Sequence, residues 1–153
     1  MRIAIQGQVG SFHDQAAQQW YGSDTEITPC TTFNEVFAAY DNGDADAIVT
    51  AVENTLFGSI NEVYRYIEEC DAPIIGEIKL PVEQMLIGLP GTKLSDITEV
   101  YSHPVALSQC RYFLQKNLPQ ATPIEFFDTA GAVEFVKQNN SRHCAAIAGQ
   151  TAA

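Results

Sequence analysis

Short strand-like segments alternate with helix-like segments along most of this chain, and this order constrains the fold more than any other feature. The strand-like segments are apolar or alternate, and the segments between them carry apolar residues at helical spacing. Because a helix that links two strands usually leaves them parallel, the order predicts small parallel sheets covered by helices, an α/β fold. The expected strands are 2–8, 27–31, 47–52, 100–102, 124–127 and 144–148, and the expected helices are 13–20, 33–40, 59–67, 106–117 and 129–138.

Residues 74–89 break this order, because their strand-like alternation runs for about three times the usual length of a strand. Such a length suits a strand that leaves one lobe and enters another. We therefore expect a first α/β lobe at 1–76, an extended crossing strand at 77–89 and a second α/β lobe at 90–153 that is incomplete at its C-terminus. Lobes of this kind bind a ligand in a cleft at the carboxyl ends of their strands.

The charge of the chain excludes several classes of partner. Nineteen acidic and eight basic residues give a net charge of −11, and the basic residues are scattered. Binding to nucleic acid or to an anionic membrane needs clustered cations, so we expect neither partner. Hydrophobic residues make up 46% of the chain, which excludes disorder, yet no apolar run approaches the roughly 20 residues of a membrane span. With no signal-peptide core expected either, we predict a soluble, cytoplasmic protein.

Cysteine and histidine spacing argues against a disulfide framework or a metal site. The four cysteines lie far apart with no C-x-x-C pair, which favours buried, reduced thiols. His13 and His143 have no companions at metal-ligand spacing, so we expect no metal. A G-x-S-x-G nucleophile elbow is also absent from the sequence, which disfavours a Ser/His/Asp hydrolase.

Two polar segments follow expected strands in the first half of the chain. Glycines around Ser11 allow a tight turn, and Ser11 either helps to bind a carboxylate or caps the next helix; spacing leaves both open. Glu53, Asn54 and Thr55 offer an acid, an amide and a hydroxyl at one strand end. They serve either as a site or as ordinary turn and cap groups.

Two more polar segments follow strands in the second half. His103 comes after Ser102, and it acts either as an acid or base near neutral pH or as a structural hydrogen-bond donor. Asp128 or Thr129 caps the last helix, and the small residues after them leave its N-terminal amides accessible to a ligand. Capping alone also explains both residues.

Taken in order, these segments closely resemble the prephenate dehydratase family, and the resemblance covers essentially the whole chain. The Tyr-Ser-His-Pro…Gln-Cys and Val-Glu-Asn-Thr…Gly-Ser blocks are specific for it. The resemblance implies a cytoplasmic lyase of phenylalanine biosynthesis that converts prephenate to phenylpyruvate without a metal or other cofactor. It also implies two α/β lobes with a cleft between them, similar to the periplasmic-binding-protein type II fold. The matching segments are 10–13 with 16–17, 52–55 with 58–60, 86–88, 100–104 with 109–110, 128–132 and 145–148.

The resemblance also implies roles for individual residues. Hydroxyls, amides and helix N-terminal N–H groups suit a dianionic substrate in a chain with few cations. We expect prephenate as the small-molecule substrate and a homo-oligomer in the full-length protein. Catalytic roles fall on Glu53, Asn54, Ser102 and Gln109, and substrate-binding roles fall on Ser11, Thr55, His103, Asp128, Thr129, Ala130 and Gly131.

One departure from the family limits these expectations. The family's Thr-Arg-Phe segment, whose threonine is assigned as a proton donor, and its regulatory ACT domain lie beyond the block that matches 145–148, and the 153 residues contain neither. We therefore interpret the chain as a fragment and expect it to be poorly active or inactive alone. The alternatives are a non-catalytic two-lobed module that binds a small carboxylate and an inactive truncated form of the enzyme.

Overall fold

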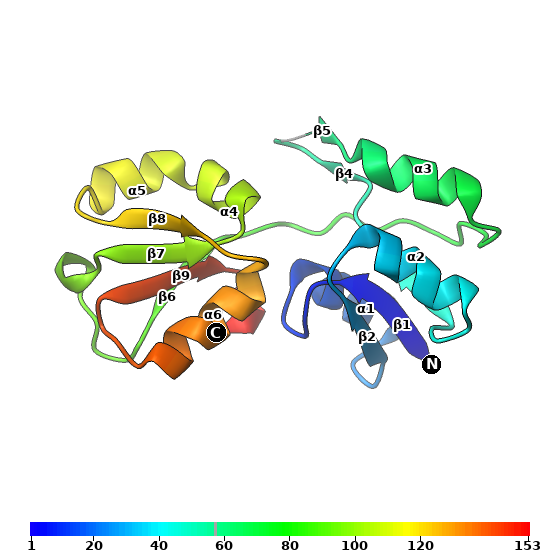
Figure 1. The fold of residues 1–153 in the computed structure, drawn as a ribbon, viewed down its shortest axis with the longest axis horizontal. Coiled ribbons are helices and arrows are strands. Elements are labelled where there is room, and N and C mark those ends of the chain that lie inside the picture. The colour runs from blue at the N-terminus through cyan, green and yellow to red at the C-terminus, as the bar shows by residue number, and fades with distance from the viewer. Residues whose placement is uncertain (57) are drawn as a thin grey trace. The chain divides into compact units, whose positions relative to one another are not determined.

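Two main sheets organise the described residues, one in each of two units, Met1–Pro81 and Val82–Ala153 (Figure 1). The first unit also holds a small two-stranded sheet. The computed structural model describes residues 1–56 and 58–153. Each unit combines its main sheet with helices, so the α/β fold class predicted from the alternation of segments is confirmed.

The first unit is built on a parallel sheet of three strands in the order β2-β1-β3. Because side chains alternate along the central strand β1, Ile3 and Ile5 pack towards one face and Ala4 towards the other. The first face is covered by α1, and the second by α2 and α3. These elements are β1 (Arg2–Gln6), α1 (Phe12–Tyr21), β2 (Glu26–Cys30), α2 (Phe33–Asp41), β3 (Ala47–Val49) and α3 (Asn61–Glu69).

The second unit has a four-stranded sheet in the order β6-β9-β7-β8. Its β9 strand is central and buried throughout, and it pairs parallel with β7 and antiparallel with β6. In Figure 1, α4 and α5 lie on one side of this sheet and α6 on the other. The elements are β6 (Met85–Gly88), η1 (Leu94–Asp96), β7 (Glu99–Ser102), α4 (Pro104–Gln109), α5 (Arg111–Asn117), β8 (Thr122–Glu125), α6 (Thr129–Asn139), β9 (Cys144–Ala148) and η2 (Gln150–Ala152).

Three expected elements differ in more than a shift of about two residues at an end. Residues 71–84, all of which the structure describes, form no strand, so only β6 remains of the long strand expected over 74–89. The strand expected to be buried on both faces at 47–52 ends at Val49 and is a half-buried edge strand. The helix expected over 106–117 is two helices, because the backbone of Cys110 leaves the helical region at φ −93° and ψ 2°.

All four cysteines are free in the structure. Their spacing favours buried thiols, and two of the four are buried. Cys30 and Cys144 are buried, while Cys70 and Cys110 are partly buried. Burial raises the pKa of the Cys110 thiol, which favours the unreactive protonated form.

Candidate functional site

The loop that follows β1 is held by a reciprocal cap at the start of α1. The Oγ atom of Ser11 accepts a hydrogen bond from the Asp14 N–H at 3.2 Å, and the Asp14 carboxylate accepts one from the Gly10 N–H at 2.7 Å. Ser11 and Asp14 are only 6% and 2% exposed. Of the two roles left open for Ser11, the structure shows the cap. Substrate binding by its side chain stays a prediction that this burial does not favour.

Asp14 is a member of this loop that the sequence analysis did not select. Its second carboxylate oxygen accepts a hydrogen bond from Nε2 of Gln18 at 2.9 Å, so both oxygens are used. A Ser-x-x-Asp pattern is the sequence signal that could have found it, because an acidic residue three positions after a serine cap often returns a hydrogen bond to the loop.

His13 joins two strand ends of the first unit. Its Nε2 atom accepts a hydrogen bond from the Ala51 N–H at 3.1 Å, and its ring lies edge-on to Phe33 with centroids 6.0 Å apart. Burial lowers the pKa of His13 to about 4, against the opposing effect of a hydrogen bond with the Gln6 backbone. The imidazole is therefore neutral at pH 7, with a structural role that the sequence did not indicate.

Glu53, Asn54 and Thr55 do not stand directly at a strand end. Glu53–Asn54 forms β4, which pairs antiparallel with β5 (Gly58–Ser59) in a small hairpin. The Oδ1 atom of Asn54 accepts a hydrogen bond from the Leu56 N–H at 2.9 Å, which is a turn contact. Glu53 and Thr55 are exposed. Catalysis by Glu53 and Asn54 and binding by Thr55 stay predictions.

Ser102, the last residue of β7, is fully buried. Its hydroxyl donates a hydrogen bond to the Ile147 carbonyl at 2.6 Å and so ties β7 to β9. In this structure the hydroxyl is used in a bond between two strands. The catalytic role that the resemblance implies stays a prediction.

The ring of His103 lies within electrostatic range of the carboxylate of Asp128, the residue that precedes α6. Nδ1 of His103 accepts a hydrogen bond from the Val105 N–H at 3.3 Å, which leaves Nε2 as the donor of the neutral ring. Burial lowers the pKa of His103, and the carboxylates of Asp128 and Glu125 oppose that shift. A mainly neutral His103 is suited to donate a hydrogen bond rather than to supply a positive charge.

Asp128 caps α6 by accepting a hydrogen bond from the Gly131 N–H at 2.7 Å. That N–H group is therefore already used, and a Cβ atom at Gly131 would lie only 3.2 Å from the Asp128 carboxylate, a tight contact. Thr129 and Ala130 occupy the first turn, where backbone N–H groups have no acceptor within the helix. Substrate binding by these four residues stays a prediction.

Gln109, at the end of α4, pairs with a residue that the sequence analysis missed. Nε2 of Gln84 donates a hydrogen bond to Oε1 of Gln109 at 3.2 Å. The structure therefore brings Gln109 beside Gln84, and His103 into the electrostatic range of Asp128. Glu53 and Asn54 belong to the other unit.

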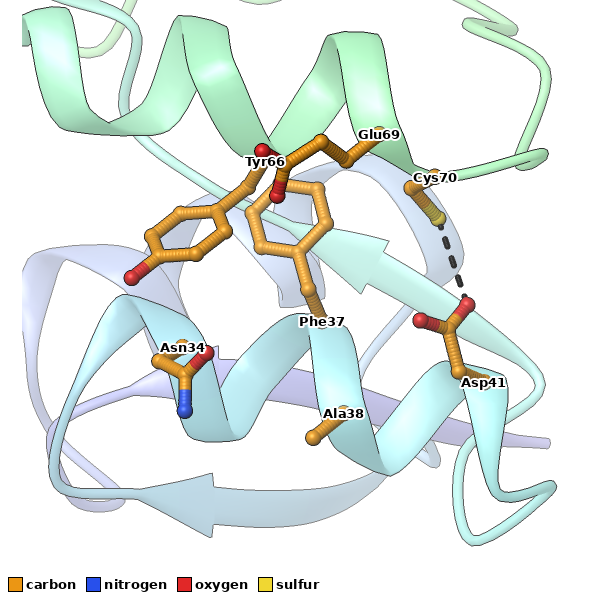
Figure 2. Close-up of a pocket in the computed structure, with 7 residues that line it drawn as sticks. All are labelled: Asn34, Phe37, Ala38, Asp41, Tyr66, Glu69 and Cys70. Carbon is orange, nitrogen blue, oxygen red and sulfur yellow. Dashed lines mark hydrogen bonds between the residues drawn. The ribbon is translucent and has the colours of Figure 1, made fainter.

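A small pocket lies elsewhere in the first unit, between α2 and α3 (Figure 2). Its volume is about 140 Å³. Phe37 and Tyr66 stack in it with centroids 5.4 Å apart, and the Cys70 thiol donates to the Asp41 carboxylate at 3.5 Å. None of the residues selected from the sequence lines it. Because no residue of the family motifs lies there, we do not place the site in this pocket.

Across residues 1–56 and 58–153, no group of histidine, cysteine or acidic side chains is arranged to hold a metal ion. Within the same described residues, no helix has both the length and the apolar character needed to cross a membrane.

Comparisons with known proteins agree with the motifs. The family described as prephenate dehydratase matches residues 3–153. Arogenate dehydratase 5, a chloroplastic protein of Arabidopsis thaliana, is 39% identical over the whole chain, which covers 36% of that protein. A bifunctional chorismate mutase/prephenate dehydratase of Aquifex aeolicus is 35% identical over the whole chain, which covers 41% of it. The chain thus spans about two fifths or less of these curated relatives.

Solved structures show the same fold. A prephenate dehydratase from Arthrobacter aurescens, solved in complex with L-Phe, superposes with a TM-score of 0.88 and 28% identity, and the chain covers 51% of it. A methionine-binding protein, MetQ, is similar in fold alone, with a TM-score of 0.50 and 13% identity over 99% of the chain and 71% of its own length. The expected similarity to the periplasmic-binding-protein fold is confirmed at this level.

Proposed function

Because the chain belongs to the prephenate dehydratase family, we propose that it is the catalytic domain of a lyase that converts prephenate to phenylpyruvate in phenylalanine biosynthesis. The match of this family over residues 3–153 is the observation that carries the proposal. Relatives named arogenate dehydratase are 39% and 40% identical to this chain, so arogenate is the second candidate substrate. We also propose a cytoplasmic location and a homo-oligomeric protein.

The proposed reaction makes limited demands on the protein. Loss of CO2 and of a ring hydroxyl as water leaves an aromatic ring, and aromatisation supplies the driving force. The protein must orient the carboxylates and assist departure of the hydroxyl. Neutral donors suit the first task in a chain with a net charge of −11, because short local hydrogen bonds do not depend on the long-range field.

We assign binding of a substrate carboxylate to the second unit. The support is the pair of donors offered by Nε2 of His103 and by the first turn of α6, together with the side chain of Gln109. The lowered pKa of His103 disfavours this ring as the proton donor to the leaving hydroxyl, since little of it is protonated at neutral pH. Its proposed role is therefore substrate binding. Asn54 and Glu53 keep their proposed catalytic roles from the family motif.

The direct test is whether the complete protein converts prephenate to phenylpyruvate. A second assay asks whether it converts arogenate to phenylalanine. Asn54→Ala and Gln109→Ala should each lower turnover by about 10-fold or more while the circular dichroism spectrum is unchanged. Gln115→Ala, on the exposed side of α5, is the matched control for Gln109→Ala. Wild-type turnover in both site variants would show that the site inferred from the family motifs is misplaced.

A further inference from the structure

Gln84 lies at the sheet edge that carries the predicted site of the second unit. It directly precedes Met85, and Met85 pairs with Ala148 at the carboxyl end of β9. Because β7 runs parallel to β9, the carboxyl end of β7, where His103 follows, is at the same edge. A residue with no assigned role therefore stands beside the polar groups proposed to bind the substrate.

The two ends of the Gln84 amide have different surroundings. Its Nε2 atom donates to Oε1 of Gln109 at 3.2 Å. Its own Oε1 atom is buried and has no hydrogen-bond partner in the part of the chain that the structure describes. A buried carbonyl without a donor costs stability, so an apolar side chain would serve packing at least as well. Polar groups kept at such a cost are typical of functional positions.

We propose that Gln84 is a positioning residue for Gln109, in that its donated hydrogen bond fixes the carbonyl end of the Gln109 amide and presents the NH2 end to a substrate carboxylate. Loss of this bond removes one constraint on the orientation of the Gln109 amide, and a flipped amide would present its carbonyl oxygen, which would repel an anion. The inference rests on the proposed function and adds a residue to the same site.

Gln84→Met tests the proposal, because it removes both polar atoms and keeps a similar volume. In the complete protein we expect kcat/KM to fall by about 10-fold, as expected for one hydrogen bond, while the melting temperature stays equal or rises. A double-mutant cycle with Gln109→Ala then separates positioning from an independent effect. If Gln84 acts through Gln109, the double variant should be no slower than Gln109→Ala alone. Gln84→Glu, which retains size but cannot donate once ionised, should lose at least as much, because its charge also repels the anionic substrate, and it serves if Gln84→Met folds poorly.

The outcomes are distinct. An active wild-type protein with unchanged kcat/KM in Gln84→Met or Gln84→Glu overturns the inference alone, and so does a lowered melting temperature without a kinetic effect. If the loss of kcat/KM in the double variant equals the product of the two single losses, the inference is also overturned, because Gln84 then acts independently of Gln109. A wild-type protein that converts neither prephenate nor arogenate overturns the proposed function, and the inference with it. Gln115→Met, at an exposed position of α5, should behave as wild type and controls for the substitution itself.

Discussion

The Nε2 atom of His13 accepts a hydrogen bond from the backbone N–H of Ala51 at 3.1 Å, across 38 residues of sequence. This bond joins the first turn of α1 to the segment that leaves β3. It requires an unprotonated Nε2, and burial already lowers the pKa of His13 to about 4. Protonation of one side chain therefore acts against the packing of the first unit.

Stability should consequently depend on pH through His13. The ordinary pKa of histidine is 6.5 and the folded value is about 4, so between these values the unfolded chain binds more protons. The neutral His13 ring should contribute about 3 kcal/mol to the free energy of unfolding. This contribution is complete above about pH 6.5 and is lost as the pH falls towards 4. Urea denaturation of the complete protein at pH 7.5, 6 and 5 measures this slope.

His13→Gln isolates the contribution of this ring from that of the acidic residues. The substitution retains a side-chain acceptor but cannot titrate, so the variant should lose less stability between pH 7.5 and 5 than the wild type. Equal slopes in the two proteins would contradict the assignment of a neutral His13 with a lowered pKa.

Asp14→Ala should destabilise the first unit. The Asp14 carboxylate accepts hydrogen bonds from the Gly10 N–H at 2.7 Å and from Nε2 of Gln18 at 2.9 Å, and the residue is only 2% exposed. The substitution leaves both donors without this acceptor. We expect the free energy of unfolding to fall by about 1–3 kcal/mol. Asp24→Ala, at an exposed position of the same unit, should be close to neutral. A loss equal in both variants would argue against the cap.

Local patterns predicted the elements better than they predicted the contacts between them. The strand at Cys144–Ala148 was predicted with its observed bounds, because a continuous apolar run of five residues suits a strand buried on both faces. Residues 74–84 alternate like a strand yet find no partner strand, and periodicity carries no information about pairing. The Gln84–Gln109 bond spans 25 residues and needs the sheet register, so spacing along the chain could not reveal it.

Ser102→Ala measures how much the Ser102 hydroxyl contributes to stability, at a position that the family motif marks as catalytic. The hydroxyl is the donor of a 2.6 Å bond to the Ile147 carbonyl in a fully buried setting. Its removal should lower the free energy of unfolding by about 1–3 kcal/mol. Ser108→Ala, on the exposed surface of α4, is the matched control. Unchanged stability together with a large loss of turnover would favour direct contact with the substrate instead.

Ala130→Pro tests whether the first turn of α6 binds an anion. Asp128 already occupies the Gly131 N–H at 2.7 Å, so the N–H of Ala130 is a donor that the cap does not use. Proline removes this donor and remains tolerable in the first turn of a helix. In the complete protein we expect weaker binding of a dicarboxylate analogue by calorimetry, by about 5- to 10-fold for one lost hydrogen bond, with a small change in melting temperature. Val133→Pro, in the interior of α6, should instead lower the free energy of unfolding by about 3 kcal/mol. This control would show that proline is tolerated at Ala130 because Ala130 lies in the first turn. Unchanged affinity in a folded Ala130→Pro variant would exclude this amide as a ligand.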